Sequence, residues 1–194
     1  LDDARDAAPL GEALLKGGLP AAEVTFRTDA AEESIKILAR EYPDLLLGAG
    51  TVLSEEQADR AAAAGAKFIV APGLNPRVAE HCLSKGYAYA PGVQTPSEME
   101  QALELGLKVV KFFPAEPAGG LNMIKAVAAP YTNLKFMPTG GINSRNVVDY
   151  LMYDKILACG GSWMVKKDLI AAGSWDKIRS MIKEAAEIVK EIRG

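Results

Sequence analysis

The sequence has few of the residues that build zinc sites and disulfide frameworks. Its 194 residues include one histidine, His81, and two cysteines, Cys82 and Cys159. A structural zinc ion needs four ligands that are mostly Cys or His, and a disulfide framework needs several cysteine pairs. We therefore expect no metal site of the zinc type and no disulfide framework. A magnesium ion held by carboxylates such as Glu23 and Glu116 stays open.

Long hydrophobic runs and concentrated positive charge are also missing. No apolar run approaches the roughly 20 residues that a membrane-spanning helix needs. The net charge is −3 and the Lys and Arg residues are scattered, which argues against nucleic acid as a partner. The few cysteines and the lack of a charged-then-apolar leader predict a cytoplasmic protein. With 49% hydrophobic and 24% charged residues, we expect one globular domain over 1–194.

What the sequence does contain is a repeating strand and helix pattern. Helical segments with clear start signals lie between the strands. Asn75 precedes Pro76 at one helix start, and Thr95 with Glu98 forms a capping box at another. Such alternation predicts an α/β protein with a parallel sheet. The β-prone runs are AAEVTF from Ala21, LLLGAG from Leu45, KFIVAPG from Lys67, YAYAPG from Tyr87, KVVKFFP from Lys108, LKFMPTG from Leu134 and KILACGG from Lys155.

A closed (β/α)8 TIM barrel explains this pattern better than a leucine-rich solenoid, whose LxxLxL signature is missing. Only seven strand runs are visible. The chain opens at Leu1 with a segment of helical spacing rather than with a strand. We therefore expect the first strand of the barrel to be missing from this sequence.

Strand alternation predicts which side chains point into the barrel mouth. In the first visible run Glu23, Thr25 and Arg27 share one face, and this polar face is expected to point inward. By the same alternation Lys111 points inward from its own strand.

Strand alternation also predicts how two threonines are oriented. Thr51 shares a face with Leu47 and Ala49, and Thr139 shares a face with Met137. Active sites of barrels gather at the carboxyl ends of the strands, so these polar groups are expected at one end.

Lys111 is the most informative residue, because its neighbours Val110 and Phe112 are hydrophobic. A lysine amine has a reference pKa of about 10.4, and enzymes bring imine-forming lysines to roughly 7 to 8. The simplest alternative is a lysine whose stem lies on apolar surface while its amine reaches water.

The segments AEVTFRT, GAGT, KFFPAE, PTGGI and CGGSW follow one another on successive strand ends. Together they resemble the 2-keto-3-deoxy-6-phosphogluconate (KDPG) aldolase family, which often also accepts 4-hydroxy-2-oxoglutarate (KHG). Each motif is weak alone, but five in this order are specific. The resemblance implies a class I aldolase without a cofactor, a homotrimer, and cleavage of a keto acid to pyruvate and glyceraldehyde 3-phosphate in the Entner–Doudoroff route.

The resemblance also implies roles for individual residues. Lys111 is the amine that forms the imine, and Glu23 is the general acid and base. A structural ion pair with Lys111 or Arg27 is the alternative for Glu23. Arg27, Thr51 and Thr139 bind the substrate carboxylate, with a rim salt bridge or a core hydroxyl as the alternatives.

The phosphate end of the substrate is assigned to glycine-rich loops after the last two strands. Glycine lets backbone amides approach an anion, although each pair alone could be a tight turn. The residues assigned to this cradle are Gly140, Gly141, Gly161 and Ser162, with Arg145 and Lys166 as exposed charges nearby. Pro72 and Phe113 are expected to shape the pocket.

Two other functions stay open at this stage. One is an aldolase for the galactonate epimer of the same substrate, which the sequence hardly separates. The other is a non-catalytic barrel that serves as a scaffold, although charge inside a barrel mouth lowers stability without benefit to a scaffold.

Overall fold

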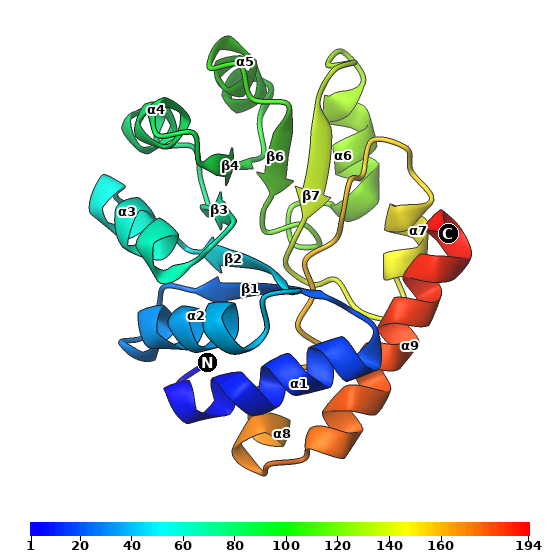
Figure 1. Cartoon of the computed structure of the whole chain (residues 1–194). Helices are drawn as coiled ribbons and strands as arrows, with labels where there is room; N and C mark the ends of the chain where they lie inside the picture. Colours follow the sequence, from blue (N-terminus) through cyan, green and yellow to red (C-terminus); the bar gives the residue numbers. More distant parts are fainter.

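A computed structural model describes all residues, 1–194, and shows short parallel strands surrounded by helices (Figure 1). The predicted α/β class with parallel pairing is confirmed. The strands are β1 (Ala21–Thr25), β2 (Leu46–Gly50), β3 (Phe68–Val70), β4 (Ala88–Ala90), β5 (Gly92–Val93), β6 (Val109–Phe112) and β7 (Lys135–Pro138).

The strands form two sheets that one chain segment links. The first sheet has the order β1-β2-β3-β4 and the second the order β5-β6-β7. Strands β4 and β5 are consecutive pieces of one run, separated by Pro91, which has no backbone N–H to donate. The carbonyl of Pro91 still accepts a hydrogen bond of 2.8 Å from the backbone N–H of Lys111. The run from 88 to 93 therefore pairs with β3 through its first half and with β6 through its second half.

The last predicted strand run, from Lys155, is only partly regular. It lies parallel to β7 through two isolated bridges, Phe136 with Ile156 and Thr139 with Gly160. On the far side of the first sheet, β1 pairs with β2 only. The pairing thus defines two parallel sheets and does not by itself close a barrel.

Helices pack around the strands, and the first and last of them lie side by side (Figure 1). At Gly17 a side chain has no room, because its Cβ would lie 2.5 Å from Cγ2 of Ile182. The helices are α1 (Ala7–Gly17), α2 (Ala30–Glu41), α3 (Glu55–Ala64), α4 (Pro76–Ser84), α5 (Pro96–Glu104), α6 (Gly120–Ala128), α7 (Val147–Leu151), α8 (Lys167–Ala171) and α9 (Trp175–Arg193), with a 3-10 turn at Ala4–Asp6.

The predicted helix starts are confirmed. The side chain of Asn75 accepts a hydrogen bond of 3.1 Å from the backbone N–H of Arg77, and Pro76 opens α4. Thr95 and Glu98 form the complete capping box of α5. No helix of the chain combines the length and the apolar character that crossing a membrane requires.

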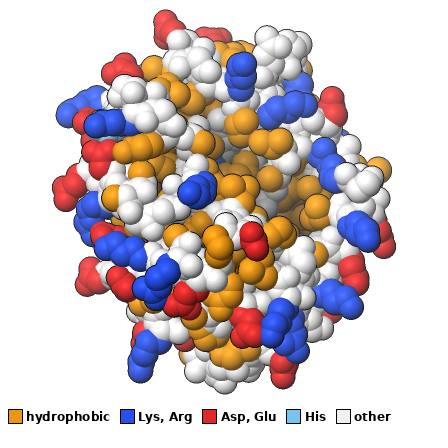
Figure 2. Space-filling model, viewed as in Figure 1, with side chains coloured by type: hydrophobic (Ala, Val, Ile, Leu, Met, Phe, Trp, Pro, Cys, Tyr) orange, Lys and Arg blue, Asp and Glu red, His pale blue; other side chains and the backbone are white.

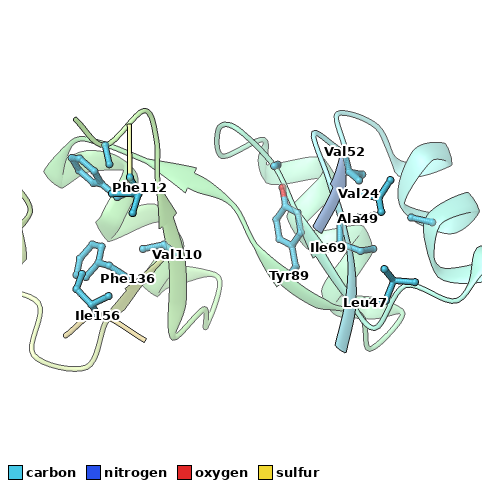
Figure 3. Packing of buried hydrophobic residues seen from close by; sticks show 14 of the residues in the cluster. Val24, Leu47, Ala49, Val52, Ile69, Tyr89, Val110, Phe112, Phe136 and Ile156 are labelled. Carbon is cyan, nitrogen blue, oxygen red and sulfur yellow. The ribbon is translucent and has the colours of Figure 1, made fainter. Parts of the chain in front are cut away.

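The hydrophobic core lies between the strands and the helices. Figure 3 shows one group of core side chains beside the first sheet, including Val24, Ala49 and Ile69, and a second group that includes Val110 and Phe136. Seen as in Figure 1, the surface is hollowed near its centre, with hydrophobic side chains around the hollow and most charges nearer the rim (Figure 2).

Register corrects one expectation about which side chains face inward. Glu23 pairs with Gly48, and Val24 pairs with Ala49, which is fully buried. Paired residues of parallel strands point to the same side of the sheet, so Leu47 and Ala49 lie on the face opposite to Glu23. The prediction that Leu47 and Ala49 share the inward face with Thr51 is therefore wrong.

Candidate active site

Lys111 on β6 is the only charged residue of the chain that is buried, with 5% of its surface exposed. Its Nζ lies 3.5 Å from Oε1 of Glu23 on β1, so residues from two different sheets meet here. Burial of an unpaired ammonium costs several kcal/mol, and a carboxylate beside it offsets part of that cost. The structure thus brings together the two residues that were predicted to carry the chemistry.

An aromatic ring forms the second contact of the lysine. Nζ of Lys111 lies 5.1 Å from the centre of the Phe113 ring, a distance at which a cation is attracted to the ring face. The side chain of Gln94 donates a hydrogen bond of 2.6 Å to the carbonyl of Phe113 and holds this segment. Gln94 was not predicted, because its contact depends on how two loops meet.

Gly50 at the end of β2 provides the space that Glu23 occupies. A Cβ at this position would overlap Oε1 of Glu23. Gly48, two residues earlier on the same face of β2, also leaves space for a neighbouring side chain. The ring of Phe68 occupies this space, and its Cδ2 would lie 2.6 Å from a Cβ on Gly48. Two glycines in one strand are unusual because glycine lowers strand stability, and this was the signal in the sequence that could have identified Gly50.

Arg27 lies just beyond β1 and is exposed. Its Nε donates a hydrogen bond of 3.2 Å to Oγ1 of Thr25, two residues earlier. No carboxylate lies within ion-pair distance of the guanidinium, so the rim salt bridge considered as an alternative is not formed. The two terminal nitrogens of the fork are available for a carboxylate.

Thr51 is the only residue other than glycine with positive φ, at 58°. This conformation is rare for a β-branched residue and costs on the order of 1–3 kcal/mol. Strand β2 ends at Gly50, so the alternation used to orient Thr51 does not extend to it. Strained backbone of this kind is concentrated at binding and catalytic sites.

Thr139 follows β7 and carries a buried hydroxyl without a hydrogen-bond partner. Leaving such a group unpaired costs about 1–3 kcal/mol. A Cβ on Gly160 would overlap this hydroxyl, so the neighbouring segment approaches it closely. Thr139 therefore has an unused donor at the carboxyl end of its strand.

The two glycine-rich loops lie side by side, since Thr139 and Gly160 form a bridge. Gly140 and Gly141 both have positive φ, 99° and 85°, and their backbone N–H groups donate to no backbone carbonyl. The same holds for the N–H groups of Gly161 and Ser162. N–H groups without an acceptor on adjacent loops are the donors that an anion requires.

The carbonyls of the first loop point the other way. Gly140 O accepts from the backbone N–H of Glu116 at 3.0 Å. Gly141 O accepts from the side-chain amides of Asn143 at 2.9 Å and Asn146 at 3.1 Å. These bonds fix the peptide planes of the loop, with the carbonyls engaged and the N–H groups left over.

The other predicted residues lie as follows. Pro72 is half-buried, and its carbonyl fills the space beside Gly92. Arg145 and Lys166 are exposed. His81 belongs to a separate cluster on the helices, with Nε2 2.9 Å from Oδ1 of Asp59.

The carboxylates proposed for a magnesium ion have different partners. Glu23 contacts Lys111, whereas Glu116 accepts a hydrogen bond from the hydroxyl of Tyr150. No group of three or more His, Cys, Asp or Glu side chains is placed to hold a metal ion.

Comparison with known proteins gives consistent matches over nearly the whole chain. The model of the family described as KDPG and KHG aldolase matches residues 1–181. A 2-dehydro-3-deoxy-phosphogluconate aldolase of Treponema pallidum (strain Nichols) is 50% identical over 189 residues, which cover 97% of this chain and 90% of the relative.

Two solved structures are similar in sequence and in fold. The 2-keto-3-deoxy-6-phosphogluconate aldolase of Zymomonas mobilis ZM4, with 3-phosphoglycerate, has a TM-score of 0.90 and 41% identity, covering 97% of this chain and 88% of that one. The KDPG aldolase of Legionella pneumophila, with pyruvate captured at low pH as a covalent carbinolamine, has a TM-score of 0.91 and 38% identity, covering 94% and 89%.

Proposed function

The chain belongs to the KDPG and KHG aldolase family, and we propose that it cleaves KDPG to pyruvate and glyceraldehyde 3-phosphate through an imine on Lys111. 4-Hydroxy-2-oxoglutarate, which would give pyruvate and glyoxylate, is the second substrate. The observation that carries the proposal is the contact of 3.5 Å between the buried amine of Lys111 and the carboxylate of Glu23. A nucleophile and an acid/base group within reach of the same atoms are what this reaction requires.

The first step joins the substrate to the enzyme. The Nζ lone pair of Lys111 attacks the C2 carbonyl carbon, and one amine proton moves to the carbonyl oxygen to give a carbinolamine. The carbinolamine hydroxyl takes a second proton from solvent and leaves as water, and a protonated imine remains. The ring of Phe113, 5.1 Å from Nζ, stabilises this positive charge. The imine is now the electron sink for cleavage.

Glu23 performs the proton transfers of the following steps. Its carboxylate takes the proton of the C4 hydroxyl, the C4–O bond becomes a carbonyl, and the C3–C4 bond breaks. The electron pair of that bond forms the enamine of pyruvate, and glyceraldehyde 3-phosphate leaves. The protonated Glu23 returns its proton to C3, and water releases pyruvate from Lys111. Proton transfer of this type contributes about 10²–10⁴ in rate.

Three residues hold the C1 carboxylate. The guanidinium of Arg27 has no competing carboxylate partner, and a fork of this kind binds both oxygens of one carboxylate. The unpaired hydroxyl of Thr139 and the strained Thr51 supply further contacts. Fixing the carboxylate turns the C2 carbonyl toward Lys111.

The free amides of Gly140, Gly141, Gly161 and Ser162 bind the phosphate at the other end of the substrate. Gly140 and Gly141 adopt positive φ angles of 99° and 85°, a region that glycine enters readily and that lets backbone amides approach a ligand closely. Pro72 and Phe113 border the pocket between the two ends.

The proposal extends to the fold and the assembly. Residues 1–194 form a single domain of the (β/α)8 barrel type, supported by the contact of α1 with α9 that brings the two ends of the helical layer together. The protein acts as a homotrimer in the cytoplasm, which sedimentation equilibrium and cell fractionation test.

The activity is tested by adding KDPG and following pyruvate with lactate dehydrogenase and NADH. Wild-type protein is expected to release one pyruvate for each KDPG, and Glu23→Gln is expected to lose about 10²–10⁴ in kcat. Absence of pyruvate release by folded wild-type protein would rule out the proposed function.

A further inference from the structure

The loop after β6 supports the loop that we assign to the phosphate. The backbone N–H of Glu116 donates a hydrogen bond to the carbonyl of Gly140. The aliphatic part of the Glu116 side chain packs against Gly141. A Cβ on Gly141 would lie 2.5 Å from Cβ and 2.6 Å from Cγ of Glu116. The glycine pair therefore rests on Glu116, which follows Lys111 by five residues.

The carboxylate of Glu116 is directed away from this loop. Its Oε1 accepts a hydrogen bond from the hydroxyl of Tyr150 on α7 and lies near Gly120, the first residue of α6. Tyr150 is buried, with 1% of its surface exposed, whereas Glu116 is exposed. Burial, together with the hydrogen bond to Glu116, raises the pKa of Tyr150, so its phenol stays a proton donor at neutral pH. A buried phenol thus holds the carboxylate of an exposed residue.

Without this partner the carboxylate of Glu116 has free N–H donors close by. The amides of Gly140 and Gly141 donate to no backbone carbonyl, and the stem of Glu116 already touches Gly141. A released carboxylate would be attracted to these amides and would repel a phosphate dianion at the same place.

We propose that Tyr150 is a positioning residue that determines preference for a phosphorylated substrate, by holding the Glu116 carboxylate away from the Gly140–Gly141 amides. This inference rests on the proposed function. Tyr150 acts through Glu116 and touches neither the imine nor the acid/base group, so only the binding of the phosphate depends on it.

The test compares KDPG with 2-keto-3-deoxygluconate, which has the same carbon skeleton and no phosphate. Tyr150→Phe is expected to raise KM for KDPG about tenfold, because the released Glu116 carboxylate repels the phosphate and competes for its N–H donors. Its kcat, and both constants for 2-keto-3-deoxygluconate, are expected to change less than about twofold. Tyr131→Phe, which removes a hydrogen bond of 3.2 Å to Glu100 elsewhere, is the matched control and is expected to leave KM unchanged.

A double variant tests whether the negative charge of Glu116, rather than its packing against the Gly140–Gly141 loop, causes the effect. In Tyr150→Phe/Glu116→Gln the released side chain is neutral, so KM for KDPG is expected to return most of the way to the wild-type value. An equal loss on both substrates, or no recovery on adding Glu116→Gln, overturns the inference. Failure of the wild-type protein to cleave KDPG would instead overturn the proposed function. The activity of the wild-type protein therefore distinguishes failure of the proposed function from failure of the inference about Tyr150.

Discussion

Gly50 and Glu23 face each other across β1 and β2 with no space for another atom between them, since a Cβ on Gly50 would overlap Oε1 of Glu23. The register places Glu23 opposite Gly48 and Thr25 opposite Gly50, so the carboxylate leans along its strand toward the carboxyl end. That lean brings it to 3.5 Å from Lys111. The position of the acid/base group thus depends on a residue with no side chain.

Replacing Gly50 by Ala is expected to displace Glu23 and to lower kcat by roughly 100-fold, because a misplacement of about 1 Å at a catalytic group has that effect. The fold is expected to survive, since alanine is tolerated in strands. Pyruvate release is measured together with circular dichroism and thermal unfolding. Wild-type kcat in folded Gly50→Ala would contradict the role given to this contact.

Arg27→Lys tests how the keto acid carboxylate is bound. A lysine keeps the positive charge but cannot form two parallel hydrogen bonds, so we expect KM to rise about tenfold with a smaller change in kcat. Arg40→Lys is the control, because Arg40 pairs with Glu41 on the exposed face of α2. If Arg27→Lys leaves KM within twofold of wild type, another residue holds the carboxylate.

An imine mechanism does not use a metal ion. Dialysis against EDTA is therefore expected to leave kcat unchanged, and added Mg²⁺ is expected to have no effect. A loss of activity that Mg²⁺ restores would favour the carboxylate-bound magnesium considered from the sequence, with Glu23 as one ligand.

Cys82 provides a test of packing by pH. Burial raises the pKa of its thiol from the usual 9.0 to about 11, and its side chain is fully buried. Because the folded state has the higher pKa, its stabilising effect is complete below pH 9 and is lost as the pH rises through 11. Urea unfolding is expected to show a smaller loss of stability from pH 8 to pH 11 in Cys82→Ser than in wild type. An identical loss in both proteins would mean that Cys82 ionises freely.

Much of this site could be predicted because it depends on strand alternation and on local chemistry. Glu23 and Lys111 lie within regular strands, where the period of two residues predicts how each side chain faces, and the two side chains meet at 3.5 Å. The predicted caps at Asn75 and Thr95 were confirmed for the same reason, since a cap needs only the next few residues.

The remaining features depend on how distant segments meet. Thr51 lies just past the end of β2 with positive φ, where alternation no longer applies. The contacts of Gly50 with Glu23 and of Gln94 with Phe113 require the register of two strands and the packing of two loops. A single sequence specifies neither.

Reductive trapping of the imine tests the role of Lys111 most directly. Protein is incubated with pyruvate and sodium borohydride, digested, and mapped by mass spectrometry. One carboxyethyl group is expected on Lys111, and none is expected in the Lys111→Met variant, which should also lose activity. Labelling of another lysine, or full turnover by Lys111→Met, would show that Lys111 does not form the imine.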